Sequence, residues 1–410
     1  MHIAIVTPQM IVGGAETYII IKSRWLIAHG HQVTVVSAGG CNVSNLPSQV
    51  EHVEFITEIS PGAFSCNEYE DYLKKLANIL IARKIEVIEA HNTSPAIHVA
   101  QAYKYHKIPF LINILNERTY LYNPFLKILT KRLAMTGVLY TLTKQMVVFI
   151  ESQLKRKIKA NIIPIPVEGI PLMEQMEGKE QKEMYILSVC RMEADKMYVK
   201  YLIQEFGVLL QTRRLPITCK LHLVGEGKLL DTVKKLVQRV NENVGAEVIT
   251  MLGTLVGEKL WQEYRGASLY VGTGTSLLLA ASCGKPALIP GYTIKSMPYA
   301  WGVWGERESD VEVLATTEKQ NNPRSKYCDI IEELLVKCPS RAIEAGRNAH
   351  RIYNAYYSIE PIMERWQKEY GNIVMIFSKK AVEIEKAIDI AFHVKLYRIV
   401  WKCYNIIRKR

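Results

Sequence analysis

The sequence predicts an α/β protein with two doubly wound domains that follow one another in the chain and face each other across a cleft. Two series of alternating strands and helices carry this prediction, one on each side of a charged, methionine-rich stretch at 169–183. Several strands are continuously apolar, which is typical of parallel strands that helices cover on both faces. A chain of 410 residues is also too long for one ordinary core, so two domains are expected.

The composition, 49% hydrophobic and 22% charged residues, is typical of a soluble globular protein. Met1 and His2 lead directly into an apolar strand, so we expect no secretory leader, and no apolar run approaches the roughly 20 residues of a membrane-spanning helix. The eight cysteines are scattered without a CxxC pair, which indicates a reducing cytoplasm and predicts neither a metal site nor a disulfide framework.

The formal net charge of +12 points to an anionic partner or to a basic surface without one. Nucleic acid, anionic lipid and a negatively charged small ligand are the candidate partners. Neither zinc-finger spacing, an aromatic RNP-like strand nor a helix-turn-helix pattern is present, so no nucleic acid is expected.

The first domain is expected over residues 1–168. Its predicted strands are 3–7, 33–37, 85–90, 109–115, 138–142 and 162–163, and its predicted helices are 15–30, 69–84, 96–105 and 124–135. The helix at 124–135 is amphipathic with a basic face, and further basic residues follow at 155–159.

Candidate ligand-binding residues of this domain follow its strands. Gly13 and Gly14 stand where the first strand gives way to a helix, and such small residues let backbone amides approach a ligand. Their spacing differs from the GxGxxG of a dinucleotide site, which argues against hydride transfer. His91 and the run Asn116-Glu117-Arg118 come at strand ends, where ligands bind in open α/β sheets. His91 could equally be a capping or core histidine.

The second series follows the predicted linker at 169–183 and forms a domain over 184–345. Its predicted strands are 186–189, 219–224, 248–252, 269–271 and a further apolar strand after Pro286, and its predicted helices are 200–211, 229–240, 259–265 and 277–282.

The stretch from Ser268 to Pro290 reads as a strand, a Gly/Thr turn, a short apolar helix and a second strand. Thr275 or Ser276 can cap that helix, whose N-terminus then offers free N–H groups and roughly half a positive charge. This arrangement predicts a binding site for a phosphate group. Many α/β proteins make the same turn without a ligand, so that alternative stays open.

The chain ends in helix. Residues 341–374 have a helical pattern that breaks before Pro361, and 346–375 are expected to return to the first domain. A basic amphipathic tail, 376–410, follows. This tail could lie on an anionic membrane surface, or it could pack on the protein with a solvated basic face.

Six motifs occur in the order and at the spacing of one enzyme family. They are Gly13-Gly14-Ala15-Glu16 with Gly30-His31-Gln32-Val33, Glu89-Ala90-His91-Asn92, Ser188-Val189-Cys190-Arg191 with Lys196, Leu223-Val224-Gly225-Glu226-Gly227, Leu252-Gly253, and Ala280 through Pro286. Over roughly residues 1–370 the chain resembles a family-4 retaining glycosyltransferase with the GT-B fold.

The resemblance implies a nucleotide-sugar donor, most simply a uridine diphosphate sugar, and no separate cofactor or metal. Arg191 and Lys196 would neutralise the leaving diphosphate, and His91 would orient the donor sugar. Donor-binding residues would be Gly13, Gly14, Gly225, Gly253, Gly272, Gly274, Thr275 and Ser276. Acceptor-side candidates are Glu16, Asn116, Glu117 and Arg118. The acceptor would be a glycan or a lipid-linked glycan in cell-surface polysaccharide synthesis, at the inner face of a membrane.

The chain departs from this family at the paired glutamates of its ExxxxxxxE motif, which fall on Val271 and Leu279. The second glutamate normally grips the ribose hydroxyls, and leucine accepts no hydrogen bond. The Asn-Gly of the family's domain-joining motif is replaced by Ile165-Pro166. A catalytically degenerate GT-B protein that binds a nucleotide-sugar or a partner enzyme is therefore the alternative hypothesis, and a nucleotide-sugar epimerase is a third.

Overall fold

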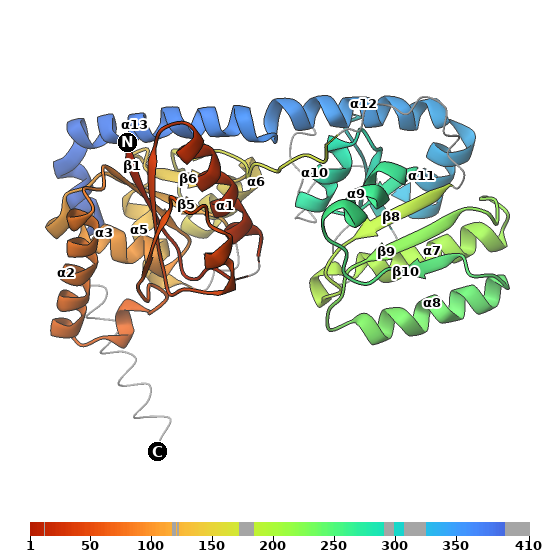
Figure 1. Cartoon of the computed structure of the whole chain (residues 1–410), viewed down its shortest axis with the longest axis horizontal. Coiled ribbons are helices and arrows are strands. Elements are labelled where there is room, and N and C mark those ends of the chain that lie inside the picture. Colours follow the sequence, from red (N-terminus) through yellow and green to blue (C-terminus); the bar gives the residue numbers. More distant parts are fainter. Residues whose placement is uncertain are drawn as a thin grey trace, which may run out of the picture. The chain divides into compact units, whose positions relative to one another are not determined.

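The computed structural model describes residues 1–11, 13–116, 120, 123–171, 184–290, 299–306 and 325–389. The chain forms two compact units. Unit 1 comprises Met1–Pro166 and the C-terminal segment from Ile359, and unit 2 comprises Val167–Ser358. Each unit contains a seven-stranded sheet rich in parallel strands, with helices packed on it (Figure 1), which confirms the predicted pair of doubly wound α/β domains.

The sheet of unit 1 is parallel throughout and has the strand order β3-β2-β1-β4-β5-β6-β7. Its strands are β1 (His2–Val6), β2 (Gln32–Ser37), β3 (Glu51–Glu54), β4 (Val87–His91), β5 (Phe110–Ile114), β6 (Leu139–Thr141) and β7 (Ala160–Ile162). Every residue of β4 and β5 is buried, as expected for central parallel strands. Of these strands, only β3 escaped prediction, because its sequence EHVE has a single apolar residue at the sheet edge.

The helices of unit 1 are α1 (Gly14–Ala28), α2 (Cys66–Ala82), α3 (Ser94–His106), α5 (Pro124–Arg132), α6 (Lys144–Leu154) and α13 (Ile359–Ile388). A capping box starts α2, since Ser65 accepts from the Glu68 N–H and Glu68 accepts from the Ser65 N–H. The helix α6, capped by Thr143, was not among the predicted elements.

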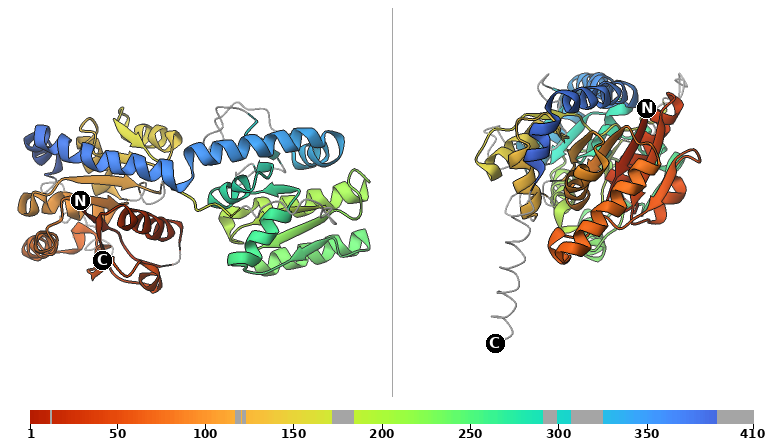
Figure 2. Two further views of the ribbon diagram at one scale, coloured as in Figure 1. Left: turned by 45° about the horizontal axis from the view of Figure 1, so that its top comes forward. Right: turned by 90° about the vertical axis from the view of Figure 1, so that its left-hand side faces the viewer.

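The long helix α13 packs along unit 1 against α1, α3, α5, β4 and β5 (Figure 2). Its buried stripe includes Met363, Trp366 and Tyr370, which join the same apolar core as the sheet. Side-chain hydrogen bonds also fasten it, from the Trp25 indole to Glu360 at 3.0 Å and from the Tyr140 hydroxyl to Glu369 at 2.6 Å. This C-terminal helix is therefore part of the core of unit 1.

Acid is expected to destabilise unit 1 through His98 on α3. Its Nδ1 accepts from the Tyr69 hydroxyl at 3.0 Å and its Nε2 donates to the Ile59 carbonyl at 2.7 Å, so both ring nitrogens hold the neutral form. Burial lowers the pKa of His98 from 6.5 to about 4. Because the unfolded chain then binds the proton more readily, stability is full above pH 6.5 and falls by up to about 3 kcal/mol as the pH approaches 4.

Urea titrations between pH 7 and pH 4 measure this loss. The matched variant is His98→Gln, whose amide accepts and donates at similar positions without titrating, and it should show a shallower acid slope than the wild type. An equal slope in both proteins would show that His98 does not carry the effect.

The sheet of unit 2 has the order β10-β9-β8-β11-β12-β13-β14 and is parallel except at the last two pairings. Its strands are β8 (Tyr185–Val189), β9 (Lys220–Val224), β10 (Ile249–Met251), β11 (Leu269–Val271), β12 (Ala287–Pro290), β13 (Tyr299–Trp304) and β14 (Ser325–Lys326). The helices are α7 (Tyr198–Gln211), α8 (Leu230–Val244), α9 (Gly257–Gly266), α10 (Thr275–Ser282), α11 (Tyr327–Glu332) and α12 (Pro339–Tyr356).

Two apolar clusters lie on the two faces of this sheet. Alternate strand residues enter different clusters, as the period-two geometry of a strand requires: Leu269 and Val271 pack with α7, α8 and α11, whereas Tyr270 packs with α9, α10 and α12. Figure 1 shows α7 and α8 on the side of the sheet opposite α9, α10 and α12.

The expected domain limits differ in detail from the two units. The described start of the predicted linker, 169–171, belongs to unit 2, and 172–183 lie outside the described residues. The returning helices expected at 346–375 are divided, since α12 belongs to unit 2 and α13 to unit 1. The helical pattern does break before Pro361, between Tyr356 and Ile359. Of the predicted tail at 376–410, residues up to 388 belong to α13, which is kinked at Lys380, and 390–410 lie outside the described residues.

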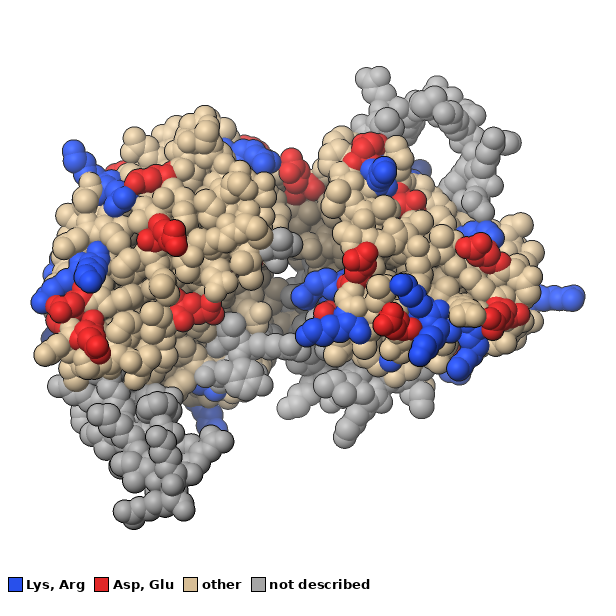
Figure 3. Space-filling view, turned by 60° about the horizontal axis from the view of Figure 1, so that its bottom comes forward, with Lys and Arg blue, Asp and Glu red and all other residues tan. Residues whose placement is uncertain are grey.

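Some of the basic residues make hydrogen bonds and ion pairs within unit 1. Arg132 on α5 donates to the carbonyls of Lys386 and Asp389, at the end of α13, and Lys157 pairs with Glu151 at 2.7 Å. On the face seen in Figure 3, Lys and Arg are interspersed with Asp and Glu. Within the described ranges, no helix has the length and apolar character needed to cross a bilayer.

Candidate functional site

The candidate residues fall into two sets at the carboxyl ends of strands, one set in each unit. The set in unit 2 surrounds the turn between β11 and α10, and the set in unit 1 surrounds the ends of β1, β4 and β5. This is where open α/β sheets place ligands.

The turn before α10 is built from Gly272, Thr273 and Gly274. Gly274 has a φ of +74° and is the N-cap of α10, and it makes no side-chain cap hydrogen bond. The predicted cap by Thr275 or Ser276 is therefore wrong. The Ser276 hydroxyl accepts from Tyr270 at 2.7 Å and donates to the Thr273 carbonyl at 3.1 Å, so it braces the turn.

Two positive groups meet at this turn. The first N–H groups of a helix have no partner within the helix, and the N-cap residue here, Gly274, has no side chain to cap them. The Lys196 ammonium donates to the Thr273 hydroxyl at 3.0 Å, which places its charge beside the positive end of α10. A cation next to a helix N-terminus is a favourable position for a phosphate.

Arg191 lies five residues before Lys196, in the loop that leaves β8. Its side chain is exposed. The loop backbone is fixed by hydrogen bonds from Cys190 to Val224 at 3.0 Å and from Met192 to Glu226 at 2.9 Å. Arg191 therefore stands on a braced loop at the carboxyl edge of the sheet.

Gly225 and Gly253 tie together the loops that follow β8, β9 and β10. The Gly225 N–H donates to the Gly253 carbonyl at 2.7 Å, and the φ angles of the two glycines are +124° and +66°. A Cβ at Gly225 would collide with the Cys190 carbonyl. These contacts give both glycines a structural role in bringing the loops close together.

Gly225→Ala is expected to destabilise unit 2 by about 3 kcal/mol or more, because alanine would combine an unfavourable φ with a backbone collision. Gly245→Ala is the matched control, since Gly245 has a φ of +75° but open space around it, and it should cost only about 1–2 kcal/mol. Urea midpoints compare the two variants, and equal losses would remove the close approach of Gly225 to Cys190 as the cause.

Val271 and Leu279 replace the two glutamates of the resembled motif. Val271 is fully buried in the cluster under α7, α8 and α11, so its side chain belongs to the core. Leu279 is partly buried and packs on the opposite cluster. Neither side chain offers a polar atom to a ligand.

In unit 1, Gly13 and Gly14 form the start of α1. Gly13 is the N-cap, Gly14 is exposed, and the carboxylate of Glu16 folds back over Gly13. Burial raises the pKa of Glu16, and His91 acts in the opposite direction. Glu16 and His91 are therefore close enough to interact electrostatically.

His91, the last residue of β4, is fully buried and stacks on Tyr18 with ring centroids 5.9 Å apart. It belongs to a buried polar cluster around the Glu89 carboxylate. That carboxylate accepts hydrogen bonds from His91 Nε2 at 2.8 Å, Asn113 Nδ2 at 3.0 Å, the Tyr18 hydroxyl at 3.4 Å, Lys22 Nζ at 2.6 Å and the Tyr370 hydroxyl at 2.6 Å.

The opposite charges of Glu89 and Lys22 stabilise each other's ionised forms. Burial alone would raise the pKa of Glu89, but Lys22 and His91 outweigh burial and hold that pKa well below its usual value. Burial lowers the pKa of Lys22 to about 8, against the opposing effect of Glu89. Both groups are therefore ionised at pH 7. The Lys22 ammonium also lies 3.3 Å from the ring centroid of Trp366, a cation–π contact with α13.

Sequence reasoning missed Glu89, Lys22 and Thr273 as members of these sites. The signal for the first two was a charge inside a buried apolar strand and a lysine within the apolar stripe of α1, since buried charges need partners. Of the acceptor-side candidates, Asn116 is exposed just after β5, whereas Glu117 and Arg118 lie outside the described residues.

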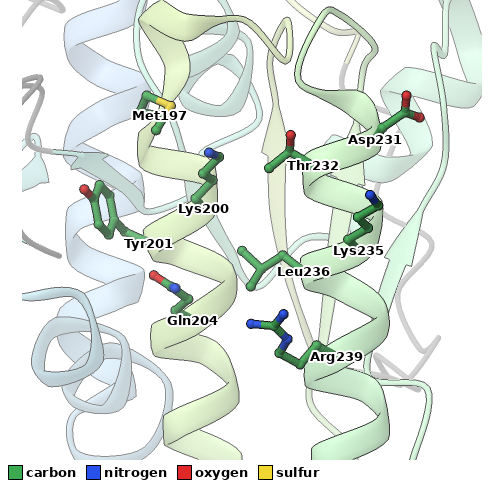
Figure 4. Close-up of a pocket in the computed structure, with 9 residues that line it drawn as sticks. All are labelled: Met197, Lys200, Tyr201, Gln204, Asp231, Thr232, Lys235, Leu236 and Arg239. Atoms are coloured by element: carbon green, nitrogen blue, oxygen red, sulfur yellow. The ribbon is translucent and has the colours of Figure 1, made fainter.

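A separate pocket of about 650 Å³ lies between α7 and α8 and contains none of the predicted site residues. Lys200 and Arg239 point toward the space between the two helices (Figure 4).

Across the parts of the chain that the structure describes, no group of three or more His, Cys, Asp or Glu residues could hold a metal ion.

Comparisons with known proteins place this architecture. The family model for Glycosyltransferase Family 4 matches residues 12–138, within unit 1, and no curated protein sequence matches the chain. A glycosyltransferase from Rickettsia africae ESF-5 is similar with a TM-score of 0.66 at 14% identity, covering 91% of this chain and 98% of that one. Sucrose-phosphate synthase from Thermosynechococcus elongatus is similar with a TM-score of 0.62 at 16% identity, covering 91% and 99%. Anabaena HepE in complex with UDP is similar with a TM-score of 0.64 at 14% identity, covering 91% and 100%. The chain thus has the GT-B fold of these glycosyltransferases.

Proposed function

We propose that this chain is a glycosyltransferase that moves a sugar from a nucleotide-diphosphate sugar, a UDP-sugar, to a glycan or lipid-linked glycan with retention of configuration. The observation that carries the proposal is the contact of Lys196 with Thr273 at the N-terminus of α10. The Family 4 match and the GT-B fold support it, as do the UDP and UDP-glucose complexes of Anabaena HepE.

In this proposal unit 2 holds the donor. Lys196, Arg191 and the first amides of α10 neutralise the diphosphate without a metal ion or other cofactor. Negative charge grows on the diphosphate as the bond to the sugar breaks, so these contacts strengthen in the transition state and accelerate the reaction. Gly272 and Gly274 leave Thr273 as the one residue of this turn with a side chain.

Unit 1 would hold the acceptor, through Glu16, Asn116 and the undescribed Glu117 and Arg118. We place the enzyme in the cytoplasm, at the inner face of a membrane, in cell-surface polysaccharide synthesis. Basic residues of unit 1 at Lys127, Lys131, Lys155, Arg156 and Lys159 motivate the membrane contact. Sedimentation with vesicles tests it, and equal binding to neutral and anionic lipid would contradict it.

Val271 and Leu279 favour the second candidate, a degenerate GT-B protein that binds a nucleotide-sugar without turnover. Loss of a charge-assisted contact to the ribose costs about 1.5–3 kcal/mol of donor binding if nothing replaces it. That loss weakens donor binding but leaves the diphosphate site intact.

An acceptor-independent assay separates the two candidates. Proton NMR can follow the hydrolysis of α-linked UDP-sugars by the purified chain, because many transfer sites pass the sugar slowly to water. The proposed enzyme should release the α-sugar first. Lys196→Ala should slow this release strongly, whereas Lys200→Ala, a variant of the pocket between α7 and α8, should retain it. Binding of UDP with neither hydrolysis of the UDP-sugar nor transfer of its sugar to a supplied glycan would favour the degenerate protein. Release of the β-sugar first would contradict retention, and release of a different sugar would indicate an epimerase.

A further inference from the structure

The Glu89 carboxylate is an unusual element of a parallel strand, because it lies in the middle of a sheet whose faces are both covered. It is fully buried and both of its oxygens are occupied, Oε1 by His91 and Asn113 and Oε2 by Lys22. A buried acid with its own cation and a full set of donors is a preorganised group, and its hydrogen-bond geometry is fixed.

That geometry determines which nitrogen of His91 carries a proton. An ionised carboxylate can only accept, and Glu89 Oε1 lies 2.8 Å from His91 Nε2, so Nε2 must donate. In the neutral imidazole the other nitrogen, Nδ1, then has a lone pair and no proton. Lys22 already balances the charge of Glu89, so a neutral ring adds no further charge to a fully buried cluster.

His91 Nδ1 is buried and has no hydrogen-bond partner among the residues that the structure describes. Such a nitrogen normally finds a partner, and a lone pair can be satisfied only by a donor. Phosphate oxygens cannot supply one, whereas a sugar hydroxyl can.

We propose that Glu89 is a positioning residue that fixes His91 as its Nε2–H tautomer and turns Nδ1 into a hydrogen-bond acceptor for a sugar hydroxyl. The ring is fully buried, so the side chains that cover Nδ1 must move when the sugar binds. The identity of the ligand rests on the proposed function, but the tautomer does not.

The tautomer is measured first, in the protein without substrate. Nitrogen NMR of the histidine rings, assigned with His91→Gln, should show a proton on Nε2 and none on Nδ1 in the wild type. The variant Lys22→Met with Glu89→Gln removes both buried charges together, and its His91 ring should populate both tautomers. A wild-type proton on Nδ1 overturns the proposal, as does an unchanged tautomer in the folded double variant. Circular dichroism verifies folding.

The ligand is measured second, by comparing UDP with UDP-glucose and UDP-galactose in calorimetric titrations. If Nδ1 accepts from the donor sugar, His91→Gln should weaken the UDP-sugar by about tenfold and leave UDP unchanged. If it accepts from the acceptor sugar, the variant should leave both affinities unchanged and raise the acceptor KM by about tenfold. An equal loss for UDP and UDP-sugar would assign His91 to the diphosphate and overturn the hydroxyl assignment. Failure of UDP to bind the wild type would instead overturn the proposed function, while the tautomer result would stand.

Discussion

Lys22→Met is expected to lower the free energy of unfolding by about 3–5 kcal/mol, the largest stability effect that we predict. Methionine retains most of the length of the lysine stem but leaves the fully buried Glu89 carboxylate without its cation and removes the contact with the Trp366 ring. An uncompensated charge in a core is far more costly than the loss of one contact. Urea and thermal unfolding, followed by circular dichroism, measure the loss.

The double variant Lys22→Met with Glu89→Gln is the control. It removes both charges, and the amide that replaces the carboxylate can either accept from or donate to the His91 ring, so most of the lost stability should return. The same large loss in the single and double variants would mean that packing around Lys22, and not the ion pair, holds α1 to α13.

Lys196→Ala is expected to lower kcat/KM for the UDP-sugar by roughly 10- to 150-fold. One charge-assisted hydrogen bond to a phosphate contributes about 1.5–3 kcal/mol, and each 1.36 kcal/mol changes the rate about tenfold. The fall should appear in kcat as well as in KM, because charge grows on the diphosphate in the transition state. Steady-state kinetics of donor hydrolysis measure both constants.

Lys200→Ala provides the matched comparison, since Lys200 lies one helical turn beyond Lys196 and lines the groove between α7 and α8. It should change kcat/KM by less than about twofold, as expected for a half-buried charge that lines this groove and not the turn before α10. Equal losses of kcat/KM in the two variants would indicate a general electrostatic attraction of the donor, without a specific phosphate-binding site at Thr273.

Much of the architecture was predictable because the apolar pattern within each short segment indicates its secondary structure. Residues 3–6 of β1 are continuously apolar, and β5 is apolar except for Asn113. Helices such as α2 have a clear apolar stripe. The strand β3 was not predictable, because its position depends on pairing with β2 and its own residues are mostly polar. The helix α6 was missed although Thr143 caps it.

The candidate site was only partly predictable. The Gly272–Gly274 turn and Lys196 were named from the sequence, but only the fold brings Lys196 to Thr273, 77 residues away in the chain. Ser276 was predicted as a helix cap because its side chain is suitable, but its hydroxyl accepts a hydrogen bond from the Tyr270 hydroxyl instead. The partnership of Glu89 with Tyr370 spans 281 residues and could not be inferred from local pattern.

Donor binding in this protein depends most on a diphosphate-binding position made by Lys196 and the N-terminus of α10. Calorimetry with UDP and uridine isolates this position, since the ratio of the two affinities reports the contribution of the diphosphate alone. We predict that Lys196→Ala reduces this ratio by about tenfold or more, in line with one lost charge-assisted contact, and that Lys200→Ala leaves it unchanged. An unchanged ratio in Lys196→Ala would contradict the account.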